Sequence, residues 1–184
     1  EEFCDQFNVT VLIAGQDDST TSLIKGVGEA LDAREGSSLI IPRLHPKFMG
    51  REDLVGPWLT TLARAKKSHV LWVPPRVSTE TIMRSVQITA SIYSNVLVGA
   101  AMLGSAPVSW ISETGREKMR GALGGIERFP LVDSGCAVEV STPAEFSAFI
   151  GAPRDEILRR CAHHYFNDGK NSERVVEAIT HELN

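Results

Sequence analysis

The stretch SLIIPRLHP, residues 38–46, decides the fold because it joins an apolar run to an arginine, a histidine and a proline. The run predicts a buried strand over residues 39–44, of the kind found in parallel sheets that are covered on both faces. Pro46 then turns the backbone away, which leaves Arg43 and His45 at the carboxyl end of that strand. Ligands of open α/β sheets bind outside this end, so the two residues form a first candidate site.

Short apolar runs alternate with helical stretches along the rest of the chain. We predict strands at residues 9–15, 39–44, 69–73, 88–93, 107–111 and 136–140. We predict helices at residues 17–33, 52–67, 78–86, 94–104, 143–150, 154–165 and 172–183. Residues 112–133 are rich in glycine and charge and predict a partly mobile loop with one helical turn. The whole pattern predicts one α/β domain over residues 1–184: a doubly wound, mostly parallel, Rossmann-like sheet of about six strands with helices on both faces.

Composition narrows the classes of partner. The formal net charge of −4 favours no electrostatic attraction to nucleic acid, so we expect no nucleic-acid partner. No apolar run reaches the ~20 residues that a helix needs to cross a bilayer, so we expect no transmembrane segment. The chain begins Glu-Glu-Phe, without an initiator Met or a signal pattern, and we expect it to be part of a longer protein.

The cysteines and histidines predict neither a metal site nor a cofactor. Cys4, Cys136 and Cys161 are odd in number and widely spaced, which fits no disulfide framework and no zinc site. We therefore expect a reducing, cytoplasmic location. His163 and His164 lie on a predicted helix without a partner at i+4, so metal ligation is not expected.

A second candidate site follows the fourth predicted strand. Ser94, next to Asn95, lies between that strand and a helix, where a serine caps the first turn. The same geometry presents free amides and the positive end of the helix dipole, which suits a phosphate group. A cap and a phosphate site are compatible, so neither interpretation excludes the other.

Other residues have an ordinary structural interpretation beside the functional one. His45 can bind a phosphate or a base, or cap a neighbouring backbone; Arg43 can pair with phosphate oxygens, or extend to solvent. Arg116, with Lys118 and Arg120, either closes over phosphates or lies in a solvated loop. The three tryptophans all occupy positions that suit a core: Trp58, Trp72 and Trp110.

Five segments occur in a familiar order: residues 43–46 (RLHP), 94–97 (SNVL), 103–108 (LGSAPV), 129–137 (FPLVDSGCA) and 166–174 (FNDGKNSER). This order resembles the C-terminal, nucleotide-binding half of GT-B fold glycosyltransferases and their relatives. These relatives include UDP-N-acetylglucosamine 2-epimerases, CDP-glycerol glycerophosphotransferases and bacterial sialyltransferases. The resemblance implies a transferase-like domain of cell-envelope polysaccharide synthesis that binds a nucleotide-activated sugar or polyol donor.

The resemblance also implies roles for single residues. His45 would contact the nucleotide, and Ser94 with Asn95 would hold the diphosphate. The chain departs from the family at two positions, where Gly99 stands in place of a ribose-binding glutamate and Asn95 in place of a second serine. An upstream N-terminal domain would supply the acceptor side, so we expect no complete catalytic centre and assign no catalytic residue. The alternative is a non-catalytic binding or scaffolding module that keeps the fold.

Overall fold

The structure is a computed structural model that describes residues 3–16, 20–48, 50–164, 170 and 173. The strands are β1 (Val9–Gly15), β2 (Ser38–Leu44), β3 (Ser68–Val70), β4 (Ile88–Ser91), β5 (Ala106–Trp110) and β6 (Val138–Val140). The α-helices are α1 (Thr20–Asp32), α2 (Glu52–Leu62), α3 (Thr79–Met83), α4 (Val96–Leu103), α5 (Glu113–Ala122), α6 (Pro130–Asp133), α7 (Pro143–Gly151) and α8 (Asp155–His164). Short 3₁₀ turns lie at Cys4–Gln6 and Pro46–Phe48.

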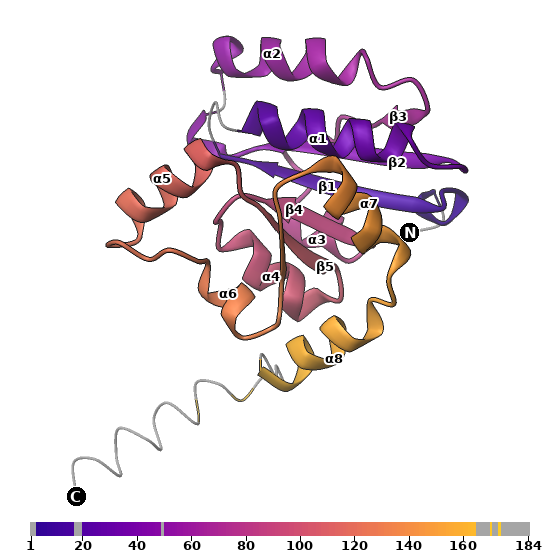
Figure 1. The fold of residues 1–184 in the computed structure, drawn as a ribbon. Helices are drawn as coiled ribbons and strands as arrows, with labels where there is room; N and C mark the ends of the chain where they lie inside the picture. The colour runs from indigo at the N-terminus through magenta and orange to yellow at the C-terminus, as the bar shows by residue number, and fades with distance from the viewer. Residues whose placement is uncertain (1–2, 17–19, 49, 165–169, 171–172, 174–184) are drawn as a thin grey trace, which may run out of the picture.

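The six strands form one sheet in the order β3-β2-β1-β4-β5-β6, and every pairing is parallel (Figure 1). The chain therefore winds outward in one direction from β1 to β3 and in the other from β4 to β6. The reversal lies between β1 and β4, which is the switch point where such sheets bind ligands. The predicted doubly wound α/β fold is confirmed.

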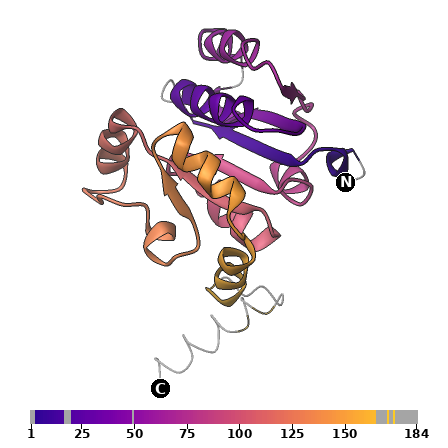
Figure 2. The same ribbon diagram turned by 45° about the vertical axis from the view of Figure 1, so that its right-hand side comes forward.

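The side chains of each strand alternate between the two faces of the sheet, and different helices cover each face. On β1, Val11 and Ile13 pack in the cluster that contains the apolar residues of α1, α2 and α7. Leu12 points the other way and packs with residues of α3 and α4, such as Met83 and Ala100. Figure 2 shows α7 and α1 on one face of the sheet, as this alternation requires.

Several predicted boundaries are corrected by the structure. Residues 112–133 contain α5 and α6, so they are not a loop with a single helical turn. The third strand ends at Val70, and Trp72 beyond it is 42% exposed, so the prediction that Trp72 lies in the core was wrong. Trp58 and Trp110 are buried as expected. The first residues of the predicted helix 17–33 and the predicted helix 172–183 fall on residues that are, Glu173 apart, outside the described ranges.

In the part of the chain that the structure describes, no helix is long and apolar enough to cross a membrane.

The three cysteines are buried and free. Burial raises the pKa of the Cys161 thiol to about 12, with the neighbouring Cys136 adding to the effect. The Cys161 thiol donates to the carbonyl oxygen of Cys136 at 3.1 Å, so this sulfur serves the packing between α8 and the segment before β6.

Candidate functional site

The parallel register brings the ends of β1 and β2 to one edge. Gly15 pairs with Leu44, and the His45 amide donates to the carbonyl of Gly15 at 3.1 Å. The first turn of α4 follows β4 on the other side of β1, so Ser94 and Asn95 reach the same edge.

Between these elements lies a cavity of about 350 Å³, which we name the edge cavity. Its wall includes Arg43 from β2 and His45 directly after β2, Ser94 and Asn95 before α4, and Glu80 from α3. The two sites predicted from separate parts of the sequence therefore meet. The volume falls at the lower end of the range of small-molecule sites, about 300–1,000 Å³.

His45 is exposed at the border of this cavity. Its Nδ1 accepts the Lys47 amide at 3.2 Å, so in the neutral ring the proton is on Nε2. That N–H is a donor suited to a phosphate or carbonyl oxygen. His45, Ser94 and Asn95 also line a second hollow of about 390 Å³ on the side of Leu123, so they stand between two open spaces.

The start of α4 differs in detail from the expected serine cap. Asn95, not Ser94, is the N-cap residue, and its side chain makes no capping bond. Ser94 Oγ accepts the Val96 amide at 3.4 Å, a long contact, while the Ser94 carbonyl accepts the Leu97 amide at 2.9 Å. The Val96 amide is thus weakly engaged, and the start of α4 borders the edge cavity, an arrangement that suits an anion.

Arg43 lines the cavity but its guanidinium is already engaged. Nη1 donates to the carbonyls of Val73 and Pro74 at 3.3 and 3.1 Å. Nη2 donates to those of Pro75 and Val77 at 3.0 and 2.7 Å. Arg43 therefore neither extends to solvent nor presents these four donors to a ligand.

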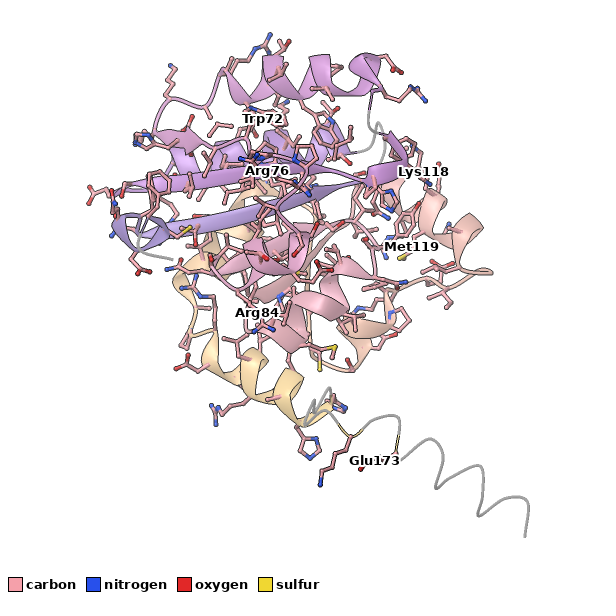
Figure 3. All side chains as sticks on the ribbon, turned by 180° about the vertical axis from the view of Figure 1, so that it is seen from behind. Trp72, Arg76, Arg84, Lys118, Met119 and Glu173 are labelled. Atoms are coloured by element: carbon pink, nitrogen blue, oxygen red, sulfur yellow. The ribbon has the colours of Figure 1, made fainter. Side chains whose placement is uncertain are left out.

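Arg116 lies elsewhere. It belongs to α5, where it donates to the Glu127 carbonyl at 2.8 Å and pairs with the Glu139 carboxylate of β6 at 2.9 Å. Arg120 pairs with Glu127 at 2.6 Å. Figure 3 labels Lys118 and Met119 on α5, away from Trp72 and Arg76. None of the three basic residues of α5 lines the edge cavity.

The sequence did not point to the α3 side of the cavity. Thr79, Glu80 and Met83 line it; the sequence predicted a helix over residues 78–86 but not its place beside the cavity. A Cβ added at Gly99 would lie 3.2 Å from Met83 Cε, so Met83 closes the space that a larger side chain on α4 would take. Within the described ranges, no three His, Cys, Asp or Glu side chains are grouped as a metal site requires.

Comparison with known proteins shows which solved structures share the fold of this chain. No protein-family model matches the chain, and no curated protein sequence matches it significantly. Solved structures do match the chain. A protein assigned as a UDP-N-acetylglucosamine 2-epimerase from Listeria monocytogenes matches all of this chain with a TM-score of 0.66 at 13% identity, over 46% of its own length. MurG from Acinetobacter baumannii matches 94% of this chain with a TM-score of 0.57 at 15% identity, over 52% of its length.

The UDP-GlcNAc 2-epimerase of Neisseria meningitidis, solved with UDP-GlcNAc bound, gives a TM-score of 0.57 at 17% identity. It is matched by 94% of this chain over 44% of its own length. The chain has the fold of one half of these proteins. The resemblance inferred from the sequence motifs is therefore confirmed at the level of the fold, and the chain spans about half the length of the structures that it matches.

Proposed function

We propose that this chain is the nucleotide-binding half of a GT-B transferase-like protein and binds a nucleotide-activated sugar or a CDP-alcohol in the edge cavity. One observation carries the proposal: His45 at the end of β2 and the first turn of α4 line the same cavity at the switch point of the sheet. The bound UDP-GlcNAc of the Neisseria 2-epimerase and the UDP complex of Anabaena HepE support the ligand class.

The charges of the cavity wall favour one orientation of the donor. Its diphosphate would meet the amides of Ser94 to Val96 and the Asn95 side chain at the positive end of α4. His45 Nε2 would donate to the nucleotide. Glu80 is the acidic residue among the described residues of the cavity wall and repels phosphate, so it would face the hydroxyls of a sugar. During transfer, the α4 end and the charge of Arg43 would stabilise the leaving nucleotide.

The rest of the active site would come from another domain. The chain spans about half of the structures that it matches, and we propose that it is the C-terminal half, with an upstream domain providing the acceptor side. The isolated chain would then bind the nucleotide without completing a transfer. A cytoplasmic role in building cell-envelope polysaccharides fits the matches to MurG and to the wall teichoic acid polymerase TagF.

A thermal-shift panel tests this function. CMP, CDP, UDP, UDP-N-acetylglucosamine, GDP and ADP are compared at millimolar concentration. A ligand at 100 times its Kd stabilises the protein by about 2.7 kcal/mol. For a domain of this size that raises the melting temperature by roughly 5–10 °C. We expect a selective shift that His45→Ala removes and that His163→Ala, a change at an exposed histidine of α8, leaves intact.

A second function rests on one specific observation, Gly99 with Met83 packed across it. Without a carboxylate at this position the cavity would lack a ribose ligand, and the domain would serve as a non-catalytic binding module. A flat panel with folded protein would support this alternative and contradict nucleotide binding by the chain.

A further inference from the structure

We propose that Arg43 is a positioning residue: it holds the segment 73–77 in place, and through it the α3 wall of the edge cavity, without contacting the phosphates of the ligand. The inference rests on the proposed function for the identity of the ligand, whereas the hydrogen bonds that support it are independent of that function. The geometry is the set of four hydrogen bonds from one guanidinium to the carbonyls of Val73, Pro74, Pro75 and Val77.

The segment needs donors from elsewhere because two of its five residues have no backbone N–H. Pro74 and Pro75 have no N–H, so the strand pairing that β3 begins cannot continue along them. Only the Val77 amide closes a local turn, to the Pro74 carbonyl at 3.0 Å. A planar guanidinium with donors in a fixed fork satisfies several converging carbonyls, whereas the compact ammonium of lysine does not.

The segment connects Arg43 directly to the cavity wall. The carbonyl of Val77, which accepts the shortest of the four bonds at 2.7 Å, immediately precedes Ser78, the N-cap of α3. Ser78 Oγ accepts the Thr81 amide at 3.1 Å and so fixes the start of the helix. Thr79 and Glu80, in the first turn of that helix, line the cavity. A shift of the segment therefore moves the wall.

The four acceptors are neutral carbonyls, so they hold the guanidinium without neutralising it. A phosphate that paired directly with the same Nη atoms would have to replace these bonds, and the segment would lose its donors. Arg43 thus acts on the ligand in two indirect ways: it shapes the α3 wall, and its charge adds to the positive potential of the cavity.

Hydrogen exchange in the ligand-free protein tests the positioning role by itself. The reporters are the amides of Val77, Thr81 and Ile82, which are all hydrogen-bonded within the segment or the first turn of α3. We expect Arg43→Lys, which keeps the charge, to speed their exchange at least tenfold. Arg76→Lys, the same change at an exposed arginine of the same segment, should leave them unchanged.

Trp72 gives a second readout because it is exposed just before the segment while Trp58 and Trp110 are buried. We expect Arg43→Lys to change acrylamide quenching of this tryptophan. In UDP and CDP titrations the same variant should bind at least tenfold more weakly than Arg76→Lys. If Arg43→Lys does not fold, Arg43→Gln is measured in the same way.

The outcomes separate this inference from the proposed function. Unchanged exchange and quenching in Arg43→Lys would overturn the positioning role, and weaker nucleotide binding with unchanged exchange would show direct contact instead. If the wild type binds no nucleotide while the exchange of the α3 amides rises in Arg43→Lys, the proposed function fails and the positioning role stands.

Discussion

Two arginines that the sequence offered as phosphate ligands, Arg43 and Arg116, occupy contrasting regions of the molecule. Arg43 lies one residue before the end of β2, beside the switch point, and donates to four neutral carbonyls. Arg116 lies on α5 and is neutralised by the carboxylate of Glu139. Both side chains are anchored, but only the first leaves its positive charge uncompensated beside a cavity.

The partners of a basic side chain therefore determine whether its positive charge is available to a ligand. A carbonyl holds a guanidinium in place and keeps the charge available to an anion nearby. A carboxylate holds it equally well and cancels the field beyond a few ångströms. The region around β2 and α4 can therefore attract a nucleotide, whereas the region around α5 serves the stability of the fold.

The largest effect should come from a negative charge placed at the start of α4. Ser94→Asp suits a helix N-terminus, so the fold should persist. Two unit charges ~4 Å apart at an effective dielectric constant of ~20 repel by about 4 kcal/mol. We expect UDP or CDP affinity to fall at least about 100-fold in calorimetric titrations.

Ser112→Asp is the matched control in the other region. Ser112 is the N-cap of α5 and accepts the Gly115 amide at 3.1 Å, a role that aspartate also fills. Nucleotide affinity should stay within about twofold of wild type, since the electrostatic penalty belongs to α4. Equal losses in both variants would remove the contrast between the regions.

A stability effect of intermediate size should follow from Arg116→Gln. The ion pair with Glu139 is partly buried, and Glu139 Oε2 has no hydrogen-bond partner among the described residues. Losing the arginine leaves this carboxylate uncompensated, so the free energy of unfolding should fall by about 1–2 kcal/mol. Urea unfolding measures it, with the more exposed pair of Arg120 as the control through Arg120→Gln.

UDP affinity in Arg116→Gln should match that of wild type. A clear loss would mean that α5 contributes to the binding site after all.

The smallest effects should come from two glycines. Gly121 lies on α5 with nothing within 4 Å of an added Cβ, so Gly121→Ala should raise the free energy of unfolding by about 0.5–1 kcal/mol and leave binding unchanged.

Gly99→Ala adds a methyl group to the edge cavity 3.2 Å from Met83 Cε, so UDP should bind a few times more weakly. Stronger binding in Gly99→Ala would contradict the placement of the ligand against α4.

The fold was largely readable from the sequence because the strands are short apolar runs between turn signals. The helix α5 was not, since Gly115, Gly121 and many charges hide its amphipathic pattern. Its signals were the cap at Ser112 and the single buried methionine, Met119, and both are weak alone.

Part of the candidate site could be predicted from the sequence. Local sequence placed His45 and Ser94 at strand ends, and parallel topology brought them together. The acceptors of Arg43 could not be predicted, because they lie 30 to 34 residues away in a segment without regular structure. The α3 wall could not be predicted for a similar reason, because the path of the segment 73–77 is what brings Thr79 and Glu80 to the cavity.

Nucleotide binding in the edge cavity can be followed residue by residue in an NMR titration of the ¹⁵N-labelled chain with UDP and with CDP. For at least one of the two nucleotides, amide shifts should change at Gly15, His45 and Glu80 and along the first turn of α4, while the amides of α5 stay in place. Shifts centred on α5, or no shifts with either nucleotide at millimolar concentration, would contradict the account.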